Sequence, residues 1–385
     1  MSNVLNLLSE QTFIEKMDNQ NTLLAAIASN GGGVKITSWS AVQQVVRLGL
    51  ASKLFAIGDQ FVSTKGDAQL KWDIIGFDND IPADSQFKHS MTIQLHDCYN
   101  TAVYDAAEAL YYCTEQLPAG TYNFTLLPNY DTAYGGGKTY QFTLTNPVPA
   151  GGQIVFPWSY NKQASTVKVT TYSSGKSNAD IEEVSVTEGS GGTNLGTADG
   201  NTTNMNHTHK LRYGSNRWLH SAIRQWLNSD KAASSWWSPQ NVFDRPPNYT
   251  STAGFLNGMD SEFLSVIGKV NKKTARNTIT DGGGYDSTEE LMFLLSRSEV
   301  YGGLENSINE GDPYFYYTNY SSLSAAGVAA DTNRIKYRSG TAQYWWLRSP
   351  YSGNGVDVRY VNPAGNINYY IAYYSYGIAP ACCII

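Results

Sequence analysis

Apolar residues near the start of the chain recur every three or four positions, which is the spacing of one face of a helix. This pattern predicts a helix over residues 10–29, ended by the glycines at 31–33. A second helix begins at Ser38 or Ser40, because either side chain can cap a helix, and it ends near Gly49. The same spacing predicts further helices over residues 101–113, 217–227 and 261–270.

Short apolar runs and alternating residues predict strands elsewhere. Before residue 100, strand-like runs occur at 53–57, 60–63 and 70–77. Over residues 117–190, several runs alternate apolar and polar residues between Pro and Gly turns, so we expect a small β-sandwich or β-meander. The stretch 191–206 is rich in Gly, Thr and Asn, which is typical of a flexible linker.

These elements indicate an α+β fold with an inserted all-β, sandwich-like subdomain. We expect the α+β domain to contain short strands, two or more helices and long loops, and to be built from residues on both sides of the insertion. The predicted order is an N-terminal helix, the first part of the domain, the insertion, the linker and the main part of the domain, over residues 1–34, 35–116, 117–190, 191–206 and 207–385.

Composition excludes several classes of protein. The chain has 385 residues, 41% of them hydrophobic, which suffices for a real core. Its net charge is −6 and it has no basic run, so we expect no nucleic-acid partner. No stretch reaches the roughly 18 apolar residues that span a bilayer, so we expect no membrane insertion. The first residues lack the basic and apolar regions of a signal peptide, which favours folding in a cytoplasm.

The sequence offers little for metal binding or catalysis. His207 and His209 have no third ligand nearby, and the acidic residues Asp78, Asp80 and Asp84 leave only a structural calcium ion open. The chain has no G-x-S-x-G, no H-E-x-x-H and no Ser/His/Asp set, so we expect no catalytic residue and no cofactor. Four cysteines fit neither a disulfide framework nor a zinc site and are expected to be reduced: Cys98, Cys113, Cys382 and Cys383.

Tyrosines are unevenly placed along the chain. None precedes Tyr99, whereas seven lie within residues 351–376, among Asn, Gly and Ser. Tyrosine offers a large contact area with few torsions to freeze, and Ser, Gly and Asn offer adaptable hydrogen bonds, as in antibody paratopes. A hairpin turning at 363–365 would bring Tyr360 near Tyr369 or Tyr370.

We therefore predict a ligand site in this stretch, flanked by the loop 351–357. An ordinary tyrosine-rich surface without a ligand is the alternative, although exposed aromatic patches are costly unless used. The predicted ligand-binding residues are Tyr351, Ser352, Asn354, Asp357, Tyr360, Asn366, Asn368, Tyr369, Tyr370, Ile371, Tyr373, Tyr374 and Tyr376.

Several short sequence motifs together resemble those of a known family. The most specific are WWLRSP at 345–350 and GIAPA at 377–381; the others lie at 58–59, 72–77, 221–228 and 293–302. Over about 35–115 and 205–385 the chain resembles phage and prophage proteins with a C-type-lectin-like domain, in the branch shared with formylglycine-generating enzymes. Its ending is similar to that of variable proteins of diversity-generating retroelements.

This resemblance implies that the last few dozen residues, about 351–376, are rewritten by reverse transcription that mutates adenines. Template Asn codons then never yield Lys, Glu, Gln, Trp or Met. Those types make up 59 of the 385 residues, so about five would be expected in a window of 35. Residues 351–385 contain none of them.

The resemblance also implies a role and partners. The protein would be a phage virion or prophage-encoded protein that binds an unknown protein or glycan on a cell surface and contacts other virion proteins. Trp345 and Trp346 would be core that holds the site rigid, and Arg348 would be structural, paired with a carboxylate such as Glu299 or capping a loop. The chain lacks the three-residue motifs that carry calcium-dependent sugar binding in true lectins. Cys382 and Cys383 are adjacent, so they lack the spacing of the cysteine pair that the related oxidases need.

Two rival functions and the oligomeric state stay open. The chain could be an invariant structural virion protein that docks through the β-rich insertion, or a carbohydrate-binding module that stacks sugars on its tyrosines. The helix over 10–29 either forms a trimer stalk, which would make a homo-oligomer, or packs on the body.

Overall fold

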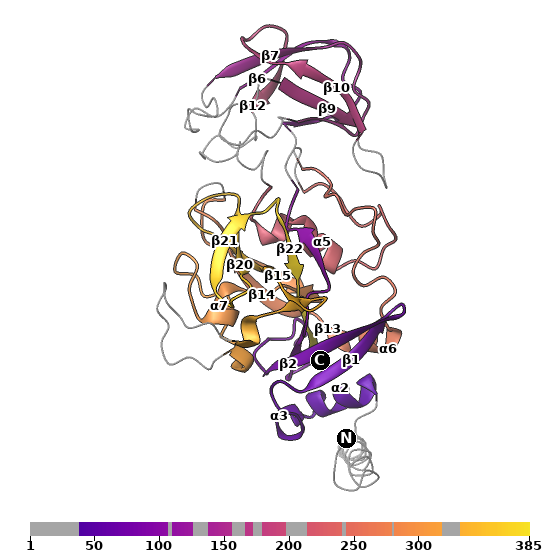
Figure 1. Ribbon diagram of the computed structural model, residues 1–385, viewed down its shortest axis with the longest axis vertical. Helices are drawn as coiled ribbons and strands as arrows, with labels where there is room; N and C mark the ends of the chain where they lie inside the picture. The colour runs from indigo at the N-terminus through magenta and orange to yellow at the C-terminus, as the bar shows by residue number, and fades with distance from the viewer. Residues whose placement is uncertain are drawn as a thin grey trace, which may run out of the picture.

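The computed structural model describes residues 38–106, 110–125, 138–155, 166–171, 179–197, 214–240, 244–278, 281–317 and 332–385. The helix predicted over 10–29 and the pair His207 and His209 lie outside these residues. The chain is an α+β protein in which strands predominate over short helices. Figure 1 shows a larger body with a β-rich insertion at one end.

One sheet of the body pairs strands from the beginning of the described chain with strands from its end. Its order is β1-β2-β3-β23-β13, and β16 also pairs with β23. β3 and β23 are buried along their whole length. β3 alternates apolar and polar residues, and the buried side chains of Thr92 and Gln94 donate hydrogen bonds to Asp80 and to the carbonyl of Ala379. The strands are β1 (Gln60–Lys65), β2 (Ala68–Phe77), β3 (Met91–Leu95), β13 (Ile267–Gly268), β16 (Met292–Phe293) and β23 (Ala381–Ile384).

A second sheet of the body carries the tyrosine-rich stretch, in the order β21-β20-β19-β22-β4. The helix predicted over 101–113 is wrong, because β4 pairs with β22 and β5 (Tyr111–Tyr112) pairs within the insertion. Tertiary pairing overrides the helix propensity of the alanines here. The strands are β4 (Asn100–Val103), β19 (Trp345–Pro350), β20 (Asp357–Val361), β21 (Ile367–Ile371) and β22 (Ser375–Ile378).

The first described helix is confirmed: α2 (Trp39–Arg47) begins after Ser38, whose side chain accepts a hydrogen bond from the backbone of Ala41. The strand predicted at 53–57 is wrong, because α3 (Ala51–Leu54) occupies its start. The remaining elements of the body are η2 (Trp218–His220), α5 (Ala222–Leu227), α6 (Ser261–Val266), β14 (Val270–Ala275), β15 (Tyr285–Glu290), α7 (Arg297–Tyr301), η3 (Phe315–Tyr317), η4 (Thr332–Arg334), β17 (Tyr337–Arg338) and β18 (Thr341–Ala342).

Two predicted helices are shorter than expected. The helix over 217–227 breaks at Ser221, which caps α5, and the buried carboxylate of Asp105 accepts hydrogen bonds from the backbone of Ser215 and Ala222. The helix over 261–270 ends at Val266, because the next residues join β13 and β14. In both places a tertiary contact ends the helical pattern.

The insertion consists of two four-stranded sheets, β10-β9-β8-β5 and β11-β7-β6-β12. Phe124 and Phe142 of one sheet share a buried core with Ile154, Val167 and Val169 of the other. The sheets are thus packed face to face as a sandwich. The strands are β6 (Gly120–Thr125), β7 (Thr139–Leu144), β8 (Gly152–Val155), β9 (Thr166–Thr171), β10 (Ala179–Ser185), β11 (Thr187–Glu188) and β12 (Thr193–Thr197).

The insertion is wider than residues 117–190. β5 lies before this range, and β12, which runs parallel to β6, lies within the stretch predicted as a linker. The linker prediction is therefore wrong over 193–197; residues 198–206 lie outside the described chain. The sequence did not indicate this strand because Gly, Thr and Asn show no apolar alternation; Thr193 and Asn194 are exposed, and Leu195 is half-buried.

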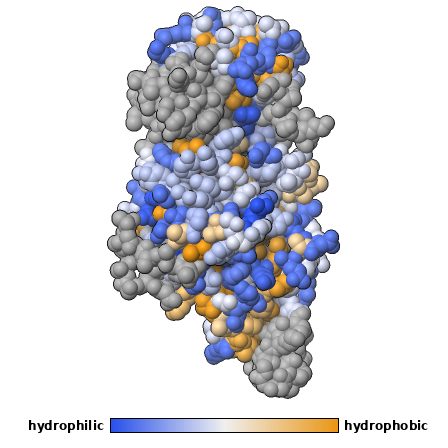
Figure 2. Space-filling view, viewed as in Figure 1, coloured by the Kyte–Doolittle hydropathy of each residue, from blue (hydrophilic) through white to orange (hydrophobic). Residues whose placement is uncertain are grey.

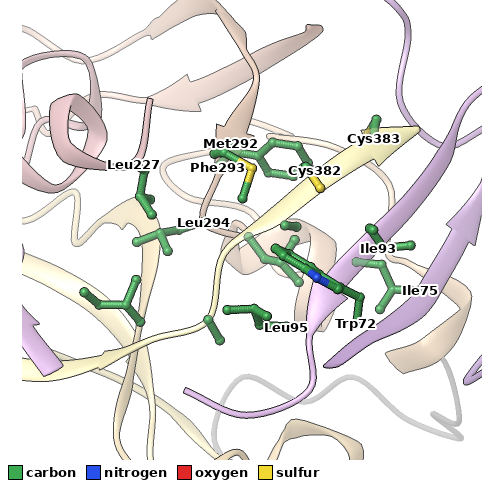
Figure 3. Close-up of a cluster of buried hydrophobic side chains, with 14 of the residues drawn as sticks. Trp72, Ile75, Ile93, Leu95, Leu227, Met292, Phe293, Leu294, Cys382 and Cys383 are labelled. Carbon is green, nitrogen blue, oxygen red and sulfur yellow. The ribbon is translucent and has the colours of Figure 1, made fainter. Parts of the chain in front are cut away.

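The core of the body is one cluster of buried side chains from both sheets and the short helices, and Figure 3 shows its part around β23. Trp72, Ile93 and Leu294 have no more than traces of exposed surface, and Cys382 lies among them. All four cysteines are free and buried. Within the described residues, no helix is long and apolar enough to cross a membrane.

We predict that Leu294→Ala lowers the free energy of unfolding by about 2–5 kcal/mol, because Leu294 is 0% exposed and its loss leaves a cavity. The matched control Leu304→Ala removes a side chain that is 50% exposed, and it should change stability by no more than about 0.5 kcal/mol. Urea unfolding followed by tryptophan fluorescence measures both. Equal effects would contradict the assigned core.

Candidate functional site

The tyrosine-rich stretch forms a hairpin at the edge of the second sheet. β20 and β21 pair antiparallel, which places Tyr360 opposite Asn368 and Arg359 opposite Tyr369. The predicted turn is confirmed: the backbone N–H of residue 362 bonds to the C=O of residue 366, and Gly365 has a φ of +81°, which favours glycine. The hairpin therefore presents one set of side chains on each face.

On one face, aromatic rings run from the core to the surface. Buried Trp346 lies 4.6 Å from the ring of Tyr376, and Tyr376 stacks on Tyr344 at 5.0 Å. Tyr370 packs edge-on against Tyr374 at 4.6 Å and lies 6.2 Å from Tyr376. Burial raises the pKa of Tyr376, so its hydroxyl stays protonated at neutral pH. The surface rings thus rest on a buried indole.

On the other face, an arginine braces a tyrosine pair. Tyr351 and Tyr369 stack at 4.0 Å with an interplanar angle of 7°. The guanidinium of Arg359 lies 4.9 Å and 5.3 Å from their ring centroids, and it bonds to Glu305 at 2.8 Å and 3.0 Å. Burial would raise the pKa of Glu305, but Arg359, with the backbone N–H of Ser352 and the charge of Arg297, lowers this pKa.

Exposure separates the predicted ligand residues into three groups. The tyrosines at 369, 370, 373 and 374 are 37%, 40%, 50% and 47% exposed, and Asn368 is exposed beside them. Tyr360 is only 8% exposed and lies beneath this surface, so it offers little area to a ligand. The half-buried members are Tyr351, Ser352, Asn354, Asp357, Asn366, Ile371 and Tyr376.

The loop before β20 is held by amides. Asn216 donates from its side chain to the carbonyls of Tyr351, Asn354 and Asp357 at 3.3, 2.8 and 2.9 Å. Asn354 accepts from the backbone of Val356 and of Asp357, and it donates to the Asp357 carboxylate at 2.6 Å. These bonds occupy Asn354 and Asp357, which therefore shape the loop.

The residues predicted as support are buried beneath the site. Trp345 and Trp346 donate from their indoles to the carbonyls of Arg334 and Ala102. Arg348 pairs with Glu299 through both guanidinium ends, as predicted, and its Nη1 also donates to the carbonyl of Leu294 at 2.9 Å. These hydrogen bonds hold β19 in place within the body.

The charged side chains beneath the site form a buried cluster around Glu299. Lys272 donates to Glu299 at 2.8 Å and also bonds to Asp80. Burial would raise the pKa of Glu299, but the charges of Arg348 and Lys272 outweigh it and lower the pKa to about 2. Burial raises the pKa of Glu310, which accepts from Ser349, to about 7.

The acidic and thiol groups singled out in the sequence are paired or buried. Within the described ranges, no group of three His, Cys, Asp or Glu side chains is placed to hold a metal ion. Asp78 bonds to His89, Asp80 to Lys272 and Asp84 to Gln86, so the acidic residues do not converge. Burial raises the pKa of both C-terminal thiols, which keeps them protonated.

Sequence reasoning missed three residues of the site. Tyr344 is 43% exposed and extends the tyrosine surface, although it precedes the variable stretch. Its even spacing from Trp346 is the one signal that placed it on the same face. Arg359 braces the tyrosine pair and Asn216 shapes the loop, but only the register and the fold bring them there.

Figure 2 shows a pale area over β21 and β22, between the hydrophobic and the strongly hydrophilic colours, as expected for tyrosine, serine and glycine. The fold and this surface define an α+β protein with a tyrosine-rich face at one sheet edge. The family described as Domain of unknown function (DUF6273) matches residues 191–385, about half of the chain, and the chain belongs to this family. Curated proteins and solved structures give no match.

The matched region does not contain all the strands of the body's two sheets. β3 and β4 lie before residue 191, yet β3 pairs with β23 and β4 pairs with β22. The residues before the insertion therefore complete both sheets of the body.

We predict that Arg348→Ala lowers the free energy of unfolding by about 3–5 kcal/mol, because it leaves the Glu299 charge buried without its bidentate partner. The matched control Arg338→Ala, on an exposed strand, should change it by at most about 0.5 kcal/mol. Thermal unfolding by circular dichroism compares the two. A stable Arg348→Ala protein would refute the structural role.

Proposed function

We propose that this protein is a binding protein whose tyrosine-rich face recognises a ligand. The observation that carries the proposal is the group of exposed tyrosines at 369, 370, 373 and 374, which stand on a buried aromatic and ionic support. Desolvation of an exposed tyrosine ring costs little free energy, and binding freezes only a few of its torsions. Such rings therefore make strong contacts. None of the four rings belongs to the buried core, which favours a role in recognition.

We further propose that a retroelement diversifies this face and that the body is a C-type-lectin-like domain. The stretch that lacks Lys, Glu, Gln, Trp and Met, 351–385, contains the exposed hairpin and the turn before β22. Its exposed side chains contact mainly one another, so replacing them disturbs little else. A coding mechanism that rewrites the stretch would therefore change the ligand and leave the fold intact.

In this proposal the protein is not an enzyme and needs no cofactor. Its setting is a phage virion, or a prophage, and its ligand is a protein or glycan on a bacterial surface. An invariant structural virion protein would use the same body with a fixed partner. That alternative differs in one respect, since it predicts no variation at the exposed tyrosines.

We predict that replacing Tyr369, Tyr370, Tyr373 and Tyr374 together by Ala abolishes binding to cells, with at least a tenfold loss and nearly unchanged Tm. The reason is that these rings are exposed and supply contact area without supporting the core. The assay is binding of the labelled protein to a panel of intact bacterial strains, scored on a strain that the original protein binds.

The matched control is the double variant Tyr285→Ala and Tyr337→Ala, which removes two exposed tyrosines from other strands. It should bind cells as the original protein does. A loss of folding in the quadruple variant would show that the four rings are core. Unchanged binding would show that the ligand lies elsewhere.

We predict that the gene lies beside a reverse-transcriptase gene and a near-copy of the codons for about 340–385 that differs only at adenines. Sequencing the locus in several isolates measures this directly. The differences should fall on codons of exposed residues and spare Trp345, Trp346 and Arg348. Isolates with identical codons and no repeat would refute diversification and leave a lectin-like protein with a fixed partner.

A further inference from the structure

β21 is the edge strand of the sheet that carries the tyrosines. The order β21-β20-β19-β22-β4 leaves it with one neighbour, and in the part of the chain that the structure describes no strand pairs with its other side. Figure 1 shows β21 at the outer side of β20. An unpaired edge is a template for another strand unless something blunts it.

The direction of the backbone groups follows from the hydrogen bonds at both ends of the hairpin. Asn362 donates to the carbonyl of residue 366, and Ala372 donates to the carbonyl of residue 356. Since bonded pairs alternate in an antiparallel ladder, Asn368 and Tyr370 also bond toward β20. The N–H and C=O groups of residues 367, 369 and 371 therefore point away from the sheet.

Two of these outward groups are already occupied. The N–H of Tyr369 donates to the side chain of Asn368 at 2.9 Å, and the carbonyl of Ile371 accepts from Tyr374 at 3.0 Å. Both groups of Ile367, the carbonyl of Tyr369 and the N–H of Ile371 have no hydrogen-bond partner among the described residues. They repeat every second residue, roughly 6.8 Å apart, which is the spacing of a strand backbone.

Aromatic rings flank this edge on both faces. Tyr369, stacked on Tyr351, lies on one face, and Tyr370, packed against Tyr374, lies on the other. A strand added beside β21 would point successive side chains to alternate faces, toward one pair of rings and then the other. A sugar ring could stack on either pair, but it does not carry the repeating donors and acceptors that match the edge.

We infer that the ligand of the tyrosine surface is an extended polypeptide segment, which binds by adding a strand to the free edge of β21. This inference rests on the proposed binding function and names the class of ligand. Main-chain hydrogen bonds do not depend on sequence, so they supply a constant part of the affinity. The flanking rings supply the specificity, and they can vary without loss of the shared docking mode.

The test uses a displayed library of random linear 12-residue peptides, selected on the full chain. Each selected peptide is then resynthesised with a single backbone N-methyl group at each position in turn. Strand addition predicts at least a tenfold loss of affinity at every second position and little change at the positions between, because only alternate N–H groups face β21. A loss without this alternation, or a failure to select any peptide, overturns the inference.

Amide hydrogen exchange by NMR gives the matching readout on the protein. On peptide binding, the amides of Ile367 and Ile371 should exchange at least tenfold more slowly. The inward amides of Asn368 and Tyr370 serve as the internal control, since they already bond toward β20. Unchanged exchange at Ile367 and Ile371 overturns the inference.

The quadruple tyrosine variant separates the two proposals. If it loses cell binding while the N-methyl scan shows no alternation, the binding function stands and strand addition fails. If the variant binds cells as before and the scan shows no alternation, both fail. Binding of a glycan array in place of every peptide would also overturn strand addition, while keeping the tyrosine surface as the site.

Discussion

The buried bond between Arg348 and Glu299 is the constraint on which the tyrosine surface depends. Arg348 lies in β19, the middle strand of the site's sheet, and Glu299 lies in α7. Two desolvated charges are stable only when their hydrogen bonds are satisfied, so this pair fixes the distance and angle between strand and helix. Lys272 ties the same carboxylate to β14. β19 in turn carries Trp346, on which Tyr376 of the tyrosine surface packs.

The surface itself contributes little to the fold. Tyr370 packs on Tyr374, and Tyr369 packs on Tyr351, so the exposed rings contact mostly one another. A rigid support and a loosely constrained face are what a recognition protein needs when its ligand changes, because variation at the face then leaves stability intact. The free backbone groups at the edge of β21 offer hydrogen bonds in addition to the side-chain contacts.

Much of this was accessible from the sequence, since turn residues and local periodicity predict α2, several strands, the turn at 363–365 and the exposed tyrosines. The failures share a physical cause. Residues 101–113 have helical propensity, but pairing with β22 and β8 overrides it. Tyr360 looks like its neighbours, yet Tyr344, Trp346 and Tyr376 pack around it and bury it. Arg359 reaches the tyrosine pair only through the hairpin. Such residues are placed by long-range pairing, which no local pattern records.

The most direct test of a rigid support with a replaceable face is a folding selection. The library randomises positions 368–370, Tyr373 and Tyr374, using the codons that arise when the adenines of an Asn codon mutate. Folded variants are identified by their resistance to protease and counted by deep sequencing. The account predicts that most variants remain folded, whereas a library of the same size at 345–348 is almost entirely unfolded. Survival limited to aromatic residues at the exposed positions would contradict it, because the tyrosines would then be part of the core.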